Sequence, residues 1–234
     1  MKKWEKYLPH IVVFLSSMGV MIVELVASRL ISKYFGNSLF TWTGVIGVVL
    51  GGISAGNFIG GRLADRYPPE RIISPLLFLA SVLVFAVLGL DALLGLFMGG
   101  SGTPSITALL ILRSILGISF LFLLPATALG TISPVMAKYA LARSDGIGNT
   151  VGTIYALSSI GSILGTFLSG FVLIPLLGVR TIVFVVSLVL ALLGLLVKGR
   201  RRVFGPWAAA VAVGLFRSEE RRVGKECRSG WSPC

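Results

Sequence analysis

The sequence has little charge and few of the side chains that bind metals. Only 13% of its 234 residues are charged, against about 25% in a soluble domain, and it has one histidine. Both cysteines, Cys227 and Cys234, lie after residue 216. The first 216 residues therefore offer no disulfide and no cysteine-ligated zinc site, and we expect no metal and no cofactor.

Apolar residues instead fill whole windows of the chain. They make up 55% of it, and the mean hydropathy is +0.94. Windows of about 20 such residues span the hydrocarbon core of a bilayer, where continuous apolar segments form helices. The first window is too long for a signal peptide and has no small-residue cleavage site, so we expect no cleavable leader.

These windows predict an all-α membrane protein with six transmembrane helices. We expect a multi-pass membrane domain over residues 1–202, followed at 203–216 by the start of a truncated seventh helix. The six helices are expected at about 11–32, 38–63, 72–96, 105–140 with breaks near Pro125 and Pro134, 149–173, and 181–197.

The net charge is +12, and most of the cations fall in segments expected on one side of the membrane. With the N-terminus inside, the outer segments hold only Lys33 and Arg180, and the loop Gly99–Pro104 holds no cation. The inner segments hold Lys2, Lys3, Lys6, Arg62, Arg66, Arg71, Lys138, Arg143, Lys198, Arg200, Arg201 and Arg202. This bias predicts an inner N-terminus and anionic lipid headgroups as partners, and it argues against nucleic-acid binding.

The tail from Arg217 onward differs abruptly from the rest. Its sequence, RSEERRVGKECRSGWSPC, resembles a translated sequencing adapter whose usual product runs RSEERRVGKECRSRWSPYH, without a break from Arg217 to Ser229. We therefore interpret residues 217–234 as an artefact and expect the natural gene to continue.

Two of the expected helices are rich in small residues. Gly52, Gly56 and Gly60 repeat every four residues in the second helix, and Gly161 and Gly165 do so in the fifth. Such spacing lets helix backbones approach closely in a bilayer. One interpretation is tight packing alone. The other is a transporter built from two three-helix units, because these are the second helices of successive units.

Ionisable residues within the apolar helices are candidate site residues. Glu24 and Arg113 lie deep in their helices, where a lone charge costs several kcal/mol, and Arg29 lies nearer the outer end. Either an ion pair of Glu24 with Arg113 or Arg29 fixes the packing, or Glu24 meets a cationic substrate or a proton. Arg29 could also reach the lipid interface. Asn57 and Tyr155 could line the same interior.

The segment GGRLADRYPPER, residues 60–71, resembles the signature loop of the major facilitator superfamily. Gly61, Leu63, Ala64, Asp65 and Arg66 match it, whereas Pro68–Pro69 replaces the usual glycine. The resemblance implies the N-terminal half of a facilitator fold, with Asp65 and Arg66 as a conformational latch that does not touch substrate. A plain topogenic loop is the alternative.

Two longer runs resemble prokaryotic fusion proteins that join such a bundle to a spermidine-synthase-like domain. They are VELVASRLISKYFGNSLFTWTGVIGVVLGGISAGNFIGGRLADR, residues 23–66, and NTVGTIYALSSIGSILGTFLSGFVLIPLLGVR, residues 149–180. The resemblance covers roughly residues 10–200. It implies a prokaryotic cytoplasmic membrane and a Rossmann-like aminopropyltransferase domain that is missing here.

The expected function follows from that resemblance. The bundle would handle or transport a small organic cation, such as a polyamine, by alternating access. Alternatively, it would anchor or regulate the absent aminopropyltransferase, or serve only as a scaffold. The glycines of the second helix lie inside an apolar span and do not follow a strand, so this chain has no nucleotide-binding loop and no catalytic residues of its own.

Overall fold

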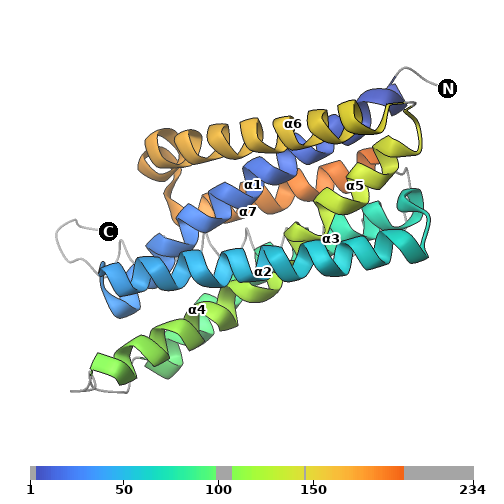
Figure 1. The fold of residues 1–234 in the computed structure, drawn as a ribbon. Coiled ribbons are helices and arrows are strands. Elements are labelled where there is room, and N and C mark those ends of the chain that lie inside the picture. Colours follow the sequence, from blue (N-terminus) through green and yellow to red (C-terminus); the bar gives the residue numbers. More distant parts are fainter. Residues whose placement is uncertain (1–3, 99–106, 145, 198–234) are drawn as a thin grey trace. The chain divides into compact units, whose positions relative to one another are not determined.

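The structure is a computed structural model that describes residues 4–98, 107–144 and 146–197 (Figure 1). All of them belong to one compact unit, Met1–Lys198. The expected outer loop Gly99–Pro104, seventh helix (203–216) and adapter-like tail (217–234) lie outside the described residues. Within the described ranges the regular structure is helical and no strand occurs.

Five stretches of the described chain are long and apolar enough to cross a membrane: Tyr7–Phe35, Leu39–Arg66, Pro69–Gly95, Ile111–Leu141 and Ile147–Val197. The helices are α1 (Trp4–Phe35), α2 (Leu39–Arg66), α3 (Pro69–Met98), α4 (Thr107–Gly130), α5 (Ile132–Leu141), α6 (Ile147–Phe167), the π-helix η1 (Leu168–Leu173) and α7 (Ile174–Val197). The predicted all-helical, multi-pass membrane class is therefore confirmed.

A serine cap and two prolines lie at the ends of α2 and α5. Ser38 caps α2 by accepting a hydrogen bond from the Thr41 amide at 3.2 Å. α2 ends one residue before the Tyr67–Pro68 link, because the residue before a proline is disfavoured in the helical region. The fourth apolar stretch is divided at Thr131, and Pro134 lies in the first turn of α5, where its missing amide hydrogen costs little.

The stretch Ile147–Val197 folds back on itself. Gly178 has a φ of 71° and a ψ of 159° inside α7, which glycine adopts without strain. Gly165 lies against Met18 of α1, while Gly19, the next residue of α1, lies beside Val186. Residues 165 and 186 would be about 31 Å apart in one straight helix. The chain therefore reverses near Gly178, and both arms pack on α1.

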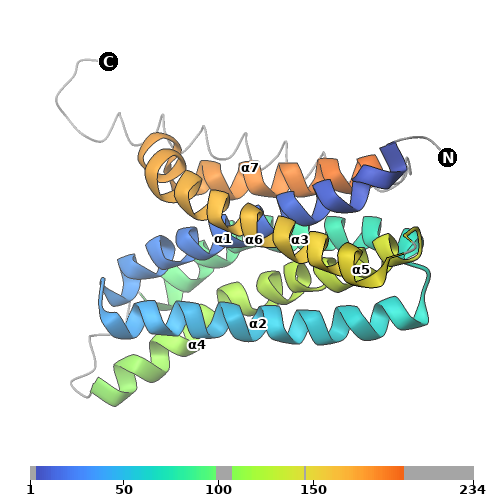
Figure 2. The same ribbon diagram turned by 45° about the horizontal axis from the view of Figure 1, so that its top comes forward.

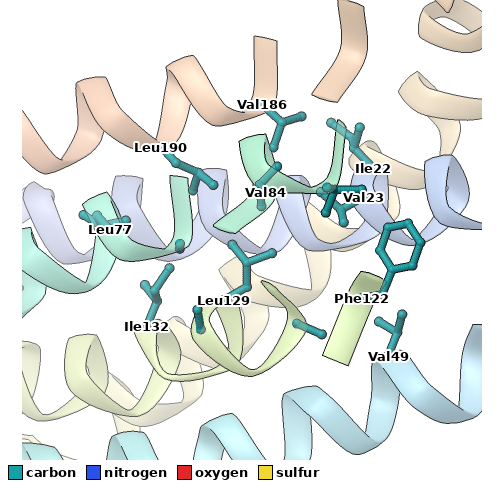
Figure 3. Close-up of a cluster of buried hydrophobic side chains, with 14 of the residues drawn as sticks. Ile22, Val23, Val49, Leu77, Val84, Phe122, Leu129, Ile132, Val186 and Leu190 are labelled. Carbon is teal, nitrogen blue, oxygen red and sulfur yellow. The ribbon is translucent and has the colours of Figure 1, made fainter. Parts of the chain in front are cut away.

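Three helix pairs dominate the packing: α2 with α4, α1 with α6, and α3 with α7 (Figures 1 and 2). The first two pairs run parallel and the third antiparallel, as their contacting residues show. Apolar side chains fill the space between the pairs, among them Ile22, Val49, Leu77, Phe122 and Leu190 (Figure 3). The polar candidates must be placed around this apolar core.

Candidate functional site

Three glycines of α2 lie directly against α4 or against Thr131, the residue that follows it. A Cβ atom added to Gly52 would lie 2.7 Å from the Ala126 Cβ, and one at Gly60 would lie 2.7 Å from the Thr131 Cα. A Cβ at Gly56 would overlap the carbonyl oxygen of Thr127. These three positions therefore accept no side chain while α4 stays where it is.

The glycines of α6 meet α1 in the same way. A Cβ at Gly161 would overlap the Phe14 carbonyl oxygen, and one at Gly165 would lie 2.5 Å from that of Met18. The next residue at this spacing, Ser169, is fully buried in η1, and its hydroxyl has no hydrogen-bond partner among the described residues. The small-residue face of α6 thus continues into the π-helix.

Glu24 lies midway along α1 and is half-buried. Ser17 and Ser28 lie on the same stripe of the helix, seven residues before it and four after it. The Ser17 hydroxyl is hydrogen-bonded to that of Ser158 on α6 at 2.7 Å. Among the described residues three salt bridges form, and none of them includes Glu24.

The ion pair suggested for Glu24 and Arg113 is not formed because the two residues lie at different depths. Gly44 lies beside Ile118 and Gly52 beside Ala126, so α4 residues lie level with α2 residues 74 positions earlier. Arg113 is therefore level with Leu39, at the end of the bundle where α1 also ends. Glu24 precedes the last residue of α1, Phe35, by eleven residues, or about 16 Å along the axis.

The remaining polar candidates lie on the outside of the bundle. Arg29 is exposed and forms no salt bridge within the described part of the chain. Asn57 of α2 is exposed, and so is Tyr155 of α6, at 68%. The structure therefore places neither Asn57 nor Tyr155 in a closed interior with Glu24.

Asp91 is a buried acid that the sequence analysis missed. Its side chain is 5% exposed and accepts a hydrogen bond from the Lys33 Nζ at 2.6 Å. The Tyr34 hydroxyl donates to its backbone carbonyl at 2.8 Å and also lies 3.1 Å from its carboxylate. The sequence signal was present, since Asp91 is an acid inside an apolar helix. This cluster ties the end of α1 to α3.

The expected latch residues, Asp65 and Arg66, lie at the opposite end of the bundle from Asp91. Asp65 pairs with Lys138 of α5 at 3.0 Å, and Lys138 also donates to the Ala64 carbonyl at 2.7 Å. Glu70, which opens α3, pairs with Arg143 at 2.6 Å. Arg66 is exposed and joins none of the described salt bridges. The two acids beside the α2–α3 link are therefore bound to α5 and to the turn that follows it.

The cavity against α1, η1 and α7 is aliphatic. Its lining includes Leu15, Met18, Ile22, Leu173 and Val186, and no charged residue. A polar cation would lose its hydration there without gaining a partner. In the described ranges no group of three or more histidine, cysteine, aspartate or glutamate residues could hold a metal ion.

Comparison of the chain with protein-family models, with curated proteins and with solved structures finds no match. The arguments for function therefore come from the arrangement of its own residues.

Proposed function

We propose that this chain folds as a six-crossing, facilitator-like bundle made of two three-helix units. The reversal at Gly178 supports a sixth crossing, because it divides Ile147–Val197 into two arms. The helix pairs support the two units. The first unit would be α1, α2 and α3, and the second α4 with α5, α6 and α7. If each helix is replaced by its counterpart in the other unit, the α1–α6 pair becomes the α4–α2 pair, and the α3–α7 pair becomes itself. The glycines lie on the second helix of each unit.

We further propose that the bundle handles a small organic cation, such as a polyamine, by alternating access. The observation that carries this proposal is Glu24: a half-buried carboxylate in the middle of an apolar helix, in none of the described salt bridges. An acid at this depth is costly unless something compensates its charge, and such acids commonly mark substrate or proton paths.

The other acid within an apolar span is unsuited to this role. Asp91 already has Lys33 and Tyr34 as partners and is almost fully buried. Asn57 and Tyr155, exposed on α2 and α6, supply polar groups on surfaces that a second half of a transporter would cover. Arg29 and Arg113 would then act near the end of the path, and Asp65 with Arg66 as the latch at the other end.

Spermidine binding to purified full chain in detergent tests this proposal, with Glu24→Gln as the main variant. We expect Glu24→Gln to weaken binding at least tenfold while thermal unfolding stays close to that of the wild type, since the substitution breaks no described ion pair. Glu24→Asp keeps the charge and should retain most of the binding. Asp91→Asn is the matched control and should do the reverse, losing stability and keeping binding.

Unchanged spermidine binding by a folded Glu24→Gln variant would rule out the cation proposal. The second candidate function, a membrane anchor for the absent aminopropyltransferase, would then stand. It is supported by the backbone contacts of Gly56 and Gly165, which make the bundle tightly packed. Placement in a prokaryotic cytoplasmic membrane with the N-terminus inside belongs to both proposals. A Ser101→Cys substitution tests that orientation. Labelling of this residue only from the cytoplasmic side would contradict it.

A further inference from the structure

The link between α2 and α3 carries more positive charge than its own acids balance. Asp65 is paired with Lys138 of α5, and Glu70 with Arg143 in the turn that follows α5. Three exposed arginines remain in the same short region, and none of them forms a salt bridge within the described ranges. They are Arg62, Arg66 and Arg71.

One of these arginines, Arg62, stacks on an aromatic side chain at the end of an apolar span. The Arg62 guanidinium lies 3.9 Å from the centre of the Phe58 ring, and Phe58 is 61% exposed. Phe58, Arg62 and Arg66 follow one another at intervals of four residues, so they share the exposed face of α2. Arg71 lies across the link of Tyr67 and Pro68, in the first turn of α3.

This arrangement has the chemistry of a phosphate site beside a hydrocarbon surface. A guanidinium binds phosphate oxygens through two parallel N–H donors, and stacking on a ring face leaves those in-plane donors available. Phe58 and Ile59 are exposed apolar side chains on the bilayer side of the arginines. A soluble phosphate would not use that apolar surface, whereas a phospholipid would use both parts.

We propose that Arg62, Arg66 and Arg71 bind the phosphate of an anionic phospholipid, with Phe58 against its acyl chain. The ion pairs of Asp65 and Glu70 are part of this site, because they keep both acids from neutralising the arginines. The site is independent of the proposed cation transport, since Glu24 lies near the middle of α1, far from the α2–α3 link. The bound lipid would hold the link at the membrane surface.

The test compares binding of phosphatidylglycerol and phosphatidylcholine to the full chain in detergent micelles, counted by native mass spectrometry. We expect the wild type to prefer phosphatidylglycerol and each arginine-to-glutamine change to weaken that preference about fivefold. The triple variant should lose it. Arg66→Lys keeps the charge and should fall between wild type and Arg66→Gln. Arg180→Gln, an exposed arginine in another part of the chain, is the matched control and should change nothing.

Three results would overturn the proposal. One is a folded triple variant, monitored by gel filtration, that still prefers phosphatidylglycerol. Another is an equal loss in Arg180→Gln, which would show a response to net charge alone. The third is displacement of the lipid by soluble glycerol phosphate at comparable concentration, which would show a phosphate site that makes no use of Phe58.

Discussion

The α2–α4 and α3–α7 pairs are held together in different ways. In α2–α4 the backbones touch, and a Cβ at Gly56 would lie 2.9 Å from the Gly130 Cα. In α3–α7 side chains fill the space. Ser81 donates a hydrogen bond to the Ser187 carbonyl at 2.6 Å, and the rings of Phe85 and Phe184 meet edge to face.

This difference reflects two ways to join helices in a bilayer. Burial of apolar surface gives no driving force there, because lipid tails are as apolar as leucine, so helices associate by close packing or by interhelical hydrogen bonds. Close packing requires small residues at fixed spacing, and α2 has them. Hydrogen bonding needs only a serine opposite a carbonyl group, and α3 has Ser74 and Ser81. The two pairs should therefore respond differently to single methyl groups.

The largest effect is expected for Gly56→Ala. The added methyl group would overlap the Thr127 carbonyl oxygen and lie 2.9 Å from the Gly130 Cα, and backbone atoms cannot move aside without moving α4. We expect the free energy of unfolding to fall by about 3 kcal/mol, at the upper end for overpacking. Denaturant unfolding of the purified chain in detergent measures it.

Gly51→Ala is the matched control on the same helix. Apart from its chain neighbours and the nearby backbone of α2 itself, no atom of the described residues lies within 4 Å of a Cβ there, so the change should be neutral or slightly stabilising through helix propensity. Equal effects of the two substitutions would mean that the glycines of α2 act through helix propensity and not through contact with α4.

The sequence predicted some of this organisation for physical reasons. Long apolar windows have few alternatives to membrane helices, and a four-residue glycine repeat marks a face where backbones can meet. The depth of a residue in the bundle was harder to predict from the sequence, because it depends on the register between helices. Arg113 counts as deep by its position in an apolar run, yet it lies level with Leu39 because Gly44 meets Ile118.

Polar partnerships between helices were also beyond sequence reasoning. Asp91 is visible as an intramembrane acid, but its partners Lys33 and Tyr34 are more than fifty residues away in the chain. The same holds for Lys138 with Asp65. Which cation meets which acid depends on the helix pairing, and no periodicity within one helix records it.

A smaller effect is expected for Gly194→Ala, the glycine contact of the α3–α7 pair. The new methyl group would meet the Phe78 ring at 3.1 Å and the Leu77 Cβ at 3.4 Å. The Phe78 ring can rotate and so move its edge by a few tenths of an ångström, whereas the backbone opposite Gly56 cannot move without moving α4. We expect a loss of about 1 kcal/mol in the same unfolding assay. A loss as large as that of Gly56→Ala would contradict the distinction between the two pairs.

The smallest effect is expected for Ser81→Ala, which removes one interhelical hydrogen bond from the α3–α7 pair. Such bonds average about 0.6 kcal/mol in membrane proteins, because the unfolded chain in the bilayer also finds partners. The Ser187 carbonyl lies within α7 and keeps its helical backbone bond, so it is not left unsatisfied.

The double variant Ser74→Ala with Ser81→Ala sharpens this last comparison, because each serine donates to a different carbonyl, seven residues apart on α7. Independent bonds should add to about 1.2 kcal/mol. Ser54→Ala, on the exposed face of α2, is the control and should have no measurable effect. If Ser81→Ala alone cost as much as Gly56→Ala, this one hydrogen bond would hold α3 against α7 as strongly as backbone contact holds α2 against α4. The α3–α7 pair would then be as intolerant of single-atom changes as α2–α4.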